Sequence, residues 1–178
     1  DRAAGKRLIG YVVMEIFVKR LIWFVVLCLV QVLVLNHLHV FHYGTPLLFI
    51  YFILQFPLGT PRWSLLLWGF FMGLIIDIFT NIPGVTTASL TIMSFIQPWL
   101  LQLFIPKDDY ATLRPSLKSL GLEIYFKYAL TIVTIFVILF FTFETFNLFN
   151  FGDWLLRVLL SVIVTLIFVF IVESFNKK

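Results

Sequence analysis

The sequence has little cysteine and little charge, two things on which secreted domains and soluble enzymes depend. Its single cysteine, Cys28, excludes an intrachain disulfide and any zinc cluster built on cysteine thiolates. Charged residues make up 12% of the 178 residues, well below the roughly 25% of soluble domains. A chain that is 61% hydrophobic would expose large apolar surfaces to water, so the composition excludes an ordinary soluble domain.

The sequence also lacks the motifs that accompany common catalytic chemistry. It has no glycine-rich phosphate-binding loop, no His-Glu-x-x-His pair and no nucleophile with a plausible base. The one sizeable polar segment, 106–121, is too short to be a catalytic domain. We therefore predict a protein that is not an enzyme, with no catalytic residues and no cofactor.

Three histidines, His37, His39 and His42, are clustered between two apolar runs and could in principle bind zinc. Zinc needs ligands in a preorganised geometry, which a short loop does not by itself provide. We predict no metal site here, and interpret the three side chains as interfacial residues beside Tyr43.

What the sequence has instead is a series of long apolar runs. A helix needs about 20 apolar residues to cross the hydrocarbon core of a bilayer. The predicted fold class is an all-α polytopic membrane protein with six transmembrane helices. The second run is short, contains Gln55 and Pro57, and could start as early as Val40. The six predicted spans cover about 21–35, 46–58, 63–79, 86–105, 122–143 and 154–172.

Positive charge alternates between the gaps that separate these runs. Lys and Arg occur in the N-terminal flank, at Arg62, in 106–121 and at the C-terminus, whereas 36–45, 80–85 and 145–152 have none. Cytoplasmic loops of membrane proteins carry an excess of Lys and Arg, so six spans place both termini in the cytoplasm. Orientation and anionic lipid also explain the net charge of +4, and we predict no nucleic-acid partner.

Residues 1–13 are less apolar than the rest of the chain and precede Met14, which begins a short basic lead into the first span. We interpret 1–13 as a leader or other upstream sequence and 14–178 as a single six-helix transmembrane domain. The alternative is that 1–13 form a basic amphipathic segment lying on the cytoplasmic leaflet.

Ionisable residues inside membrane spans are costly, and are therefore candidates for function. Asp77 is near the outer end of the third predicted span, and Gly69, Gly73 and Asp77 are four residues apart, so they share one helix face. Two glycines at this spacing allow another helix to approach closely. Two interpretations are open: a packing face on which Asp77 caps the following turn, or a carboxylate that faces a cavity or a partner.

Arg157 is one turn into the last predicted span, four residues after Asp153. These two residues can form an ion pair at the membrane surface, with the arginine reaching outward. Alternatively, Arg157 faces inward and meets Asp77 or an anionic group, because Asp77 is predicted at a similar depth. Glu123 and Lys127 have the spacing of another surface ion pair. Three glutamines are predicted to form hydrogen bonds between helices: Gln31, Gln97 and Gln102.

The segment from Gly69 to Gly84 resembles the central signature of MreD, a family of rod shape-determining membrane proteins. In that family a Gly-x-x-x-Gly-Leu-type helix leads to an aspartate and then to a short turn with glycine, often proline. Asn81 stands where many members have a glycine, and the turn is slightly tighter. The resemblance extends over most of the chain from Met14. The matching residues are Gly73, Leu74, Asp77, Pro83 and Gly84.

This resemblance implies a non-catalytic component of the elongation machinery in the bacterial cytoplasmic (inner) membrane, which scaffolds or regulates lateral peptidoglycan synthesis and hence cell shape. The implied partner is an MreC-like bitopic membrane protein, alongside MreB, RodZ, RodA and a class B penicillin-binding protein.

MreD is also distantly similar to the substrate-binding membrane subunits of energy-coupling-factor transporters, which have a six-helix fold. The alternative function is therefore a membrane subunit that binds a small molecule or a lipid intermediate, with Asp77 and Arg157 at its outer mouth. The candidate partner-facing or cavity-facing residues are Gly69, Gly73, Asp77, Pro83, Gly84 and Arg157.

Overall fold

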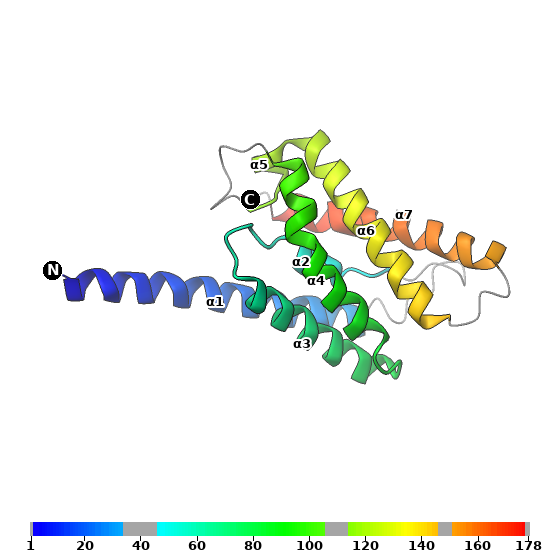
Figure 1. Cartoon of the computed structure of the whole chain (residues 1–178), viewed down its shortest axis with the longest axis horizontal. Helices are drawn as coiled ribbons and strands as arrows, with labels where there is room; N and C mark the ends of the chain where they lie inside the picture. The colour runs from blue at the N-terminus through cyan, green and yellow to red at the C-terminus, as the bar shows by residue number, and fades with distance from the viewer. Residues whose placement is uncertain (1, 34–45, 106–113, 146–150, 177–178) are drawn as a thin grey trace.

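The computed structural model describes residues 2–33, 46–105, 114–145 and 151–176, with the backbone alone for residues 2–9. All regular secondary structure in these ranges is helical, which confirms the predicted all-helical class. The helices, labelled in Figure 1, are α1 (Arg2–Leu33), α2 (Ile50–Leu54), α3 (Arg62–Thr80), α4 (Val85–Phe104), α5 (Leu117–Leu120), α6 (Leu122–Glu144) and α7 (Phe151–Phe175).

Four of the described helices are long and apolar enough to cross a membrane, as in a multi-pass membrane protein: Gly10–Leu33 of α1, together with α3, α6 and α7. α4 has the length of a span, 20 residues, but its threonine, serine and glutamine residues make it more polar. The predicted boundaries of the last four spans agree with α3, α4, α6 and α7 to within three residues at either end.

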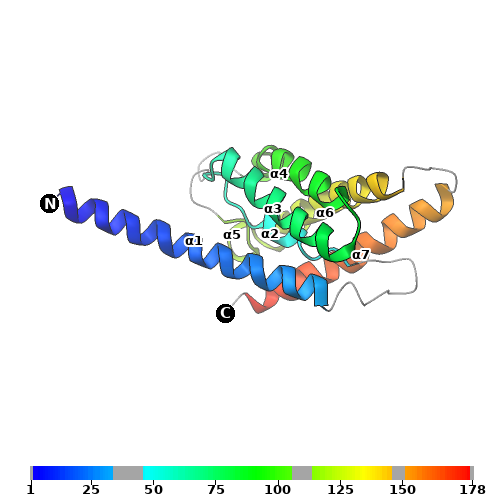
Figure 2. The same ribbon diagram turned by 90° about the horizontal axis from the view of Figure 1, so that it is seen from below.

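Helix α1 begins earlier than the first predicted span. It is continuous from Arg2, so the predicted boundary after residue 13 falls inside a helix. Its 32 residues give a length of about 48 Å at 1.5 Å per residue, more than the roughly 30 Å hydrocarbon core of a bilayer. Figures 1 and 2 show its N-terminal part projecting beyond the other helices.

Residues 46–58, here called the central segment, are where the structure differs most from the predicted spans. Instead of a full-length helix they contain only the five residues of α2. The segment still runs antiparallel to α1. Pro46 contacts Gln31 of α1, Tyr51 contacts Trp23, and Phe56 contacts Arg20, so the two segments run in opposite directions. It thus returns the chain from the end of α1 to the start of α3.

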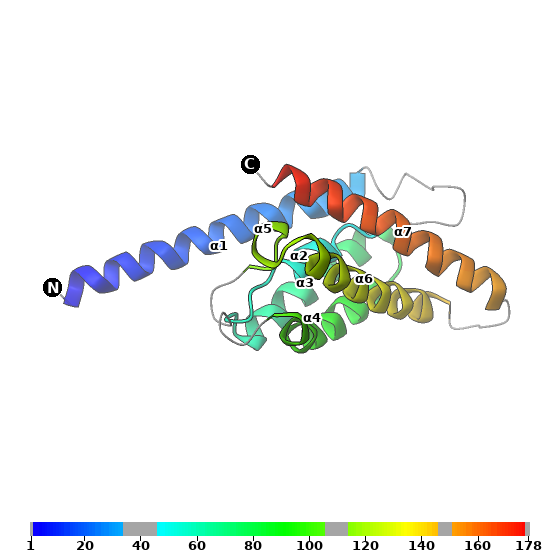
Figure 3. The same cartoon turned by 90° about the horizontal axis from the view of Figure 1, so that it is seen from above.

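The bundle has two chemically different ends. At one end, α5 and the last turns of α7 lie near the turn that leads into α3 (Figures 1 and 3). We call this the basic end, because Lys19, Arg20, Arg114 and Lys118 line one cavity there. At the opposite end are the α3–α4 turn, the last turn of α6 and the first turn of α7 (Figure 1).

The core lies around the central segment, whose residues 46–54 are all buried. α6 is the most deeply packed of the four candidate spans, with 50% of its apolar window buried, whereas α1 and α7 have only 22% and 28% buried. α1 and α7 are therefore peripheral helices with broad outer faces. Phe24, Phe52 and Trp68 join α1, α2 and α3 through ring contacts at 5.4 to 5.7 Å between centroids.

Candidate functional site

Asp77 lies in the last turn of α3 and is buried, with 6% of its surface exposed. Its carboxylate accepts four hydrogen bonds from the start of α4. The donors are the backbone N–H groups of Gly84 (3.1 Å), Thr86 (2.9 Å) and Thr87 (2.9 Å), and the Thr87 hydroxyl (2.6 Å). Of the two interpretations that the sequence left open, the structure shows the capping one.

The sequence explains why α4 takes a carboxylate from another helix. The first N–H groups of a helix have no intrahelical partner, and a side chain at the N-cap position usually accepts from them. The N-cap of α4 is Gly84, which has no side chain and a φ of 86° in the left-handed region. Asp77 supplies the missing acceptor, and its negative charge lies at the positive end of the α4 dipole.

Gly69 and Gly73 are buried on the same face of α3 as Asp77. A Cβ atom on Gly73 would lie 2.5 Å from the Cα of Thr87, and a Cβ on Gly69 would collide with the Ser94 hydroxyl. The expected close helix approach is present, but the approaching helix is α4 of the same chain. The structure thus gives both glycines an internal packing role instead of a partner-facing one.

Asn81, Pro83 and Gly84 form the exposed turn between α3 and α4. Asn81 ends α3 with a φ of 57°, in the left-handed region that glycine favours and that asparagine adopts more readily than most other residues. Asparagine can therefore end α3 in a conformation that glycine usually supplies. Pro83 and Gly84 shape the turn, and neither lines a cavity described below.

Arg157 is exposed in the second turn of α7, and Glu144 at the end of α6 is close enough to interact with it electrostatically. Within the described residues, no ion pair joins Arg157 to Asp153 or to Asp77. The Asp77 carboxylate instead bonds to α4. The predicted meeting of Asp77 and Arg157 at an outer mouth is therefore not formed.

Two of the three glutamines predicted to link helices are buried, and they bind the backbone of the central segment. Gln31 on α1 donates from Nε2 to the Pro46 carbonyl, and its Oε1 accepts from the Leu48 N–H, both at 3.0 Å. Gln97 on α4 donates to the Phe56 carbonyl at 3.0 Å. Because only helices and closed sheets satisfy their own backbone in lipid, a non-helical segment needs such partners.

Two further partners of the central segment were not found by sequence reasoning. The Leu47 N–H donates to the Thr165 hydroxyl at 3.1 Å, and the Tyr128 hydroxyl donates to the Leu54 carbonyl at 3.2 Å. The third predicted glutamine, Gln102, is exposed. The sequence contained one indication, which is that the second apolar run is short. A short run implies backbone groups without helical hydrogen bonds, but it does not identify the side chains that bond to them.

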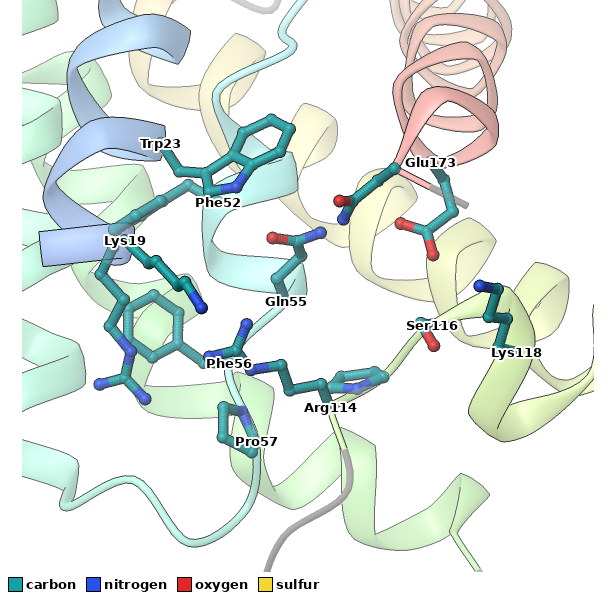
Figure 4. Close-up of a pocket in the computed structure, with 13 residues that line it drawn as sticks. Lys19, Trp23, Phe52, Gln55, Phe56, Pro57, Arg114, Ser116, Lys118 and Glu173 are labelled. Carbon is teal, nitrogen blue, oxygen red and sulfur yellow. The ribbon is translucent and has the colours of Figure 1, made fainter. Parts of the chain in front are cut away.

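At the basic end, the end of the central segment borders a cavity of about 460 Å³. Four basic side chains and one acidic side chain, Glu173, line it. In Figure 4, Lys19 and Arg114 reach from opposite sides toward the space beside Phe56, whereas Lys118 lies on the far side, near Ser116. The guanidinium of Arg20 lies over the Phe56 ring, 4.8 Å from its centroid.

Glu173, the acidic residue of this cavity, is held by hydrogen bonds to neighbouring elements. It is buried, with 4% of its surface exposed, and both of its oxygens accept hydrogen bonds. The Tyr51 hydroxyl donates to Oε2 at 2.7 Å, and the Leu117 N–H donates to Oε1 at 3.1 Å. Glu173 thus ties α7 to α2 and to the first residue of α5. Of the four basic side chains in the cavity wall, Lys19 forms an ion pair with Glu15 at 2.6 Å.

Two apolar hollows lie on the outside of the bundle. One, of about 890 Å³, lies between α1 and α3 and is mainly lined by aliphatic and aromatic side chains. The other, of about 550 Å³, lies between α6 and α7, and all of its lining side chains except Ser174 are apolar. We call them the α1–α3 groove and the α6–α7 groove.

The predicted histidine cluster at residues 37, 39 and 42 lies outside the described residues. Among the residues that the structure does describe, no group of three or more His, Cys, Asp or Glu side chains could hold a metal ion. The described residues therefore offer helix capping, internal backbone hydrogen bonding and a cavity with four basic side chains and one acidic side chain in its wall.

No protein-family model matches the sequence, and the searches of curated proteins and of solved structures find no match either.

Proposed function

We propose that this chain is a non-catalytic membrane component of the bacterial elongation machinery. In this role it spans the cytoplasmic membrane and, with an MreC-like bitopic partner, scaffolds or regulates lateral peptidoglycan synthesis and cell shape. The observation that supports the proposal is that three residues of the MreD-like segment each have a defined structural role. Gly73 permits the approach of α4, Asp77 caps it, and Gly84 adopts the turn conformation.

The proposal includes six membrane crossings and a fold like that of energy-coupling-factor substrate-binding subunits. The four apolar helices, α4 and the central segment would supply them. The central segment counts as a crossing because it runs antiparallel to α1, from beside Gln31 to beside Arg20. A non-helical crossing is tolerated where protein surrounds it, and four side chains bond its backbone. The positive-inside rule then makes the basic end cytoplasmic.

The working surfaces in this proposal are the outer faces of the peripheral helices. The Gly69/Gly73 face is filled by α4, and the buried glutamines bond to the central segment. The α6–α7 groove, in contrast, is apolar and accessible from outside, with Ile163 and Ile167 each more than half exposed. Helices associate in membranes mainly by close packing, so a shallow apolar groove suits the single transmembrane helix of a bitopic partner.

Affinity purification from the native membranes in mild detergent, followed by mass spectrometry, tests this function. We expect recovery of an MreC-like bitopic protein, with RodA, RodZ, MreB or a class B penicillin-binding protein in the wider complex. Recovery of paired ATPases and a coupling subunit would instead replace the scaffold with the alternative, a substrate-binding transport subunit.

A variant sharpens the same test. Ile167→Trp fills the α6–α7 groove without reaching the core, so we expect it to reduce recovery of the bitopic partner. Ile78→Trp, at an exposed position on α3 outside this groove, is the matched control. Equal recovery from both variants would remove the α6–α7 groove from the proposal.

A further inference from the structure

Two hollows at the basic end of the bundle meet at the same arginines. The basic cavity and the α1–α3 groove both have Arg20, Pro57 and Arg114 in their walls. The first hollow has four basic side chains in its wall, and the wall of the second is mainly apolar. A molecule that occupied both would therefore need an anionic group at one end and a hydrocarbon part at the other.

The polar end of this composite site is suited to a phosphate. Arg20 and Arg114 come from different elements, α1 and the segment before α5, and are close enough for their charges to repel. Among the described residues, no carboxylate lies within ion-pair distance of either guanidinium. Both guanidinium groups line the cavity without an ion-pair partner in the described part of the chain, so they contribute positive charge there, and arginine binds phosphate oxygens in a bidentate manner.

The apolar end of the site faces outward. Phe17, Trp63 and Phe71 line the α1–α3 groove, and each has more than half of its surface exposed. The groove therefore lies on the surface that meets lipid in a membrane-spanning chain. Tryptophan is enriched where membranes meet water, and Trp63 is the second residue of α3, at the basic end. The volumes of about 890 Å³ and 460 Å³ each fall within the roughly 300–1,000 Å³ of small-molecule sites.

We propose that this composite site binds an anionic glycerophospholipid from the leaflet at the basic end, with its phosphate between Arg20 and Arg114 and an acyl chain in the α1–α3 groove. The inference extends the proposed function but rests only on membrane insertion, because neither the wall machinery nor the α6–α7 groove enters the argument. Anionic lipid is abundant in the cytoplasmic leaflet, and basic residues near it gain binding energy.

Native mass spectrometry of the full chain in detergent tests the site, with dioleoyl phosphatidylglycerol as the probe and dioleoyl phosphatidylcholine as the neutral comparison. We expect preferential retention of phosphatidylglycerol, and an affinity about fivefold weaker in Arg20→Gln and in Arg114→Gln. Arg62→Gln is the matched control, because Arg62 is also at the basic end but lies over Trp99 and lines neither hollow. The control should bind the lipid as the wild type does.

Two additional binding measurements distinguish a lipid site from a site that binds any small anion. Ser64→Trp places an indole in the α1–α3 groove and should weaken phosphatidylglycerol binding with the arginines intact. Inorganic phosphate at the same concentration should not displace the lipid. Displacement by phosphate, equal retention of both lipids, or equal weakening by Arg62→Gln would each overturn the proposal.

Folding is checked by the thermal unfolding midpoint of every variant. Arg20 also donates a hydrogen bond to Thr60, so Arg20→Gln can destabilise the chain. Arg114 is exposed and its side chain makes no hydrogen bond among the described residues, so Arg114→Gln carries the test if Arg20→Gln does not fold. Failure of the purification experiment above would leave this binding result unaffected, so the two proposals fail separately.

Discussion

Replacing Asp77 with alanine measures how much of the α3–α4 pair depends on one carboxylate. The change removes the acceptor of four hydrogen bonds at the first turn of α4. Loss of an N-cap acceptor costs about 0.5–2 kcal/mol, and a hydrogen bond to a charged group contributes about 1.5–3 kcal/mol. The total is smaller than four such bonds, because the exposed Gly84 N–H and the half-buried Thr87 can regain water.

Thr86 is the donor that cannot be rescued in this way, since only 1% of its surface is exposed. One buried unpaired N–H costs about 1–3 kcal/mol. Together with the lost cap and its charge, we expect Asp77→Ala to lower the free energy of unfolding by about 3 kcal/mol. Asp77→Asn keeps one acceptor oxygen and should lower the free energy of unfolding by about 1–2 kcal/mol. The wild type should therefore be the most stable, Asp77→Asn intermediate and Asp77→Ala the least stable.

The assay is equilibrium unfolding in mixed detergent micelles, combined with hydrogen exchange of peptides that cover the start of α4. Asp77→Ala should shift the unfolding midpoint and speed exchange at Thr86 and Thr87. Asp153→Ala is the matched control, because it removes an exposed acid at the same end of the bundle. If Asp77→Ala unfolds and exchanges like Asp153→Ala, the capping role assigned to Asp77 is refuted.

The remaining predictions concern internal packing and backbone satisfaction. Gly73→Leu should force α3 and α4 apart and destabilise the chain by at least about 1–3 kcal/mol, whereas Gly10→Leu, which has open space around it, should not. Unfolding midpoints of the two variants check this, and equal midpoints would contradict the close packing. Gln97→Leu leaves the Phe56 carbonyl without a donor and should cost about 1–3 kcal/mol, measured against exposed Gln102→Leu. An unchanged midpoint for Gln97→Leu would mean that the central segment does not need this bond.

The long helices other than α1 could be predicted from hydropathy and from the residues that break helices. α3, α6 and α7 are continuous apolar runs with breaks at both ends, α4 is a more polar run with similar breaks, and the limits of all four were predicted closely. The predicted pair of Glu123 and Lys127 is present at 2.7 Å, because one helical turn alone fixes the geometry of residues four apart. Local spacing was sufficient for this pair, but Asp153 and Arg157, two described residues with the same spacing in α7, form no ion pair with each other.

Interactions that join separate elements were harder to predict. The shared face of Gly73 and Asp77 could be read from spacing, but not the fact that α4 covers it. The central segment has the hydropathy of a span, and its mostly non-helical backbone depends on Gln31, Gln97 and Thr165 from three other helices. Hydropathy does not indicate which side chains of other helices lie close enough to bond to the backbone of this segment.

The basic cavity is also formed by residues from separate elements, and its formation could not be predicted from the sequence. The alternation of charge along the sequence predicts that the positive residues lie on one side of the membrane. It did not show that Arg20 and Arg114, far apart in the chain, face a common space beside Phe56. The sequence predicted a meeting of Asp77 and Arg157 at the opposite end, and no ion pair joins these two described residues. Burial of the central segment is what brings the basic end together.

The central claim is that this chain works through outer helix faces, while its interior polar groups hold the fold. A photo-crosslinking amino acid at Ile167, in the α6–α7 groove and 54% exposed, tests this most directly in native membranes. We predict a covalent product with a bitopic membrane protein from Ile167, and none from Ile78, which is 68% exposed on α3. Crosslinks to lipid alone from Ile167, or the same protein product from both positions, would contradict the account.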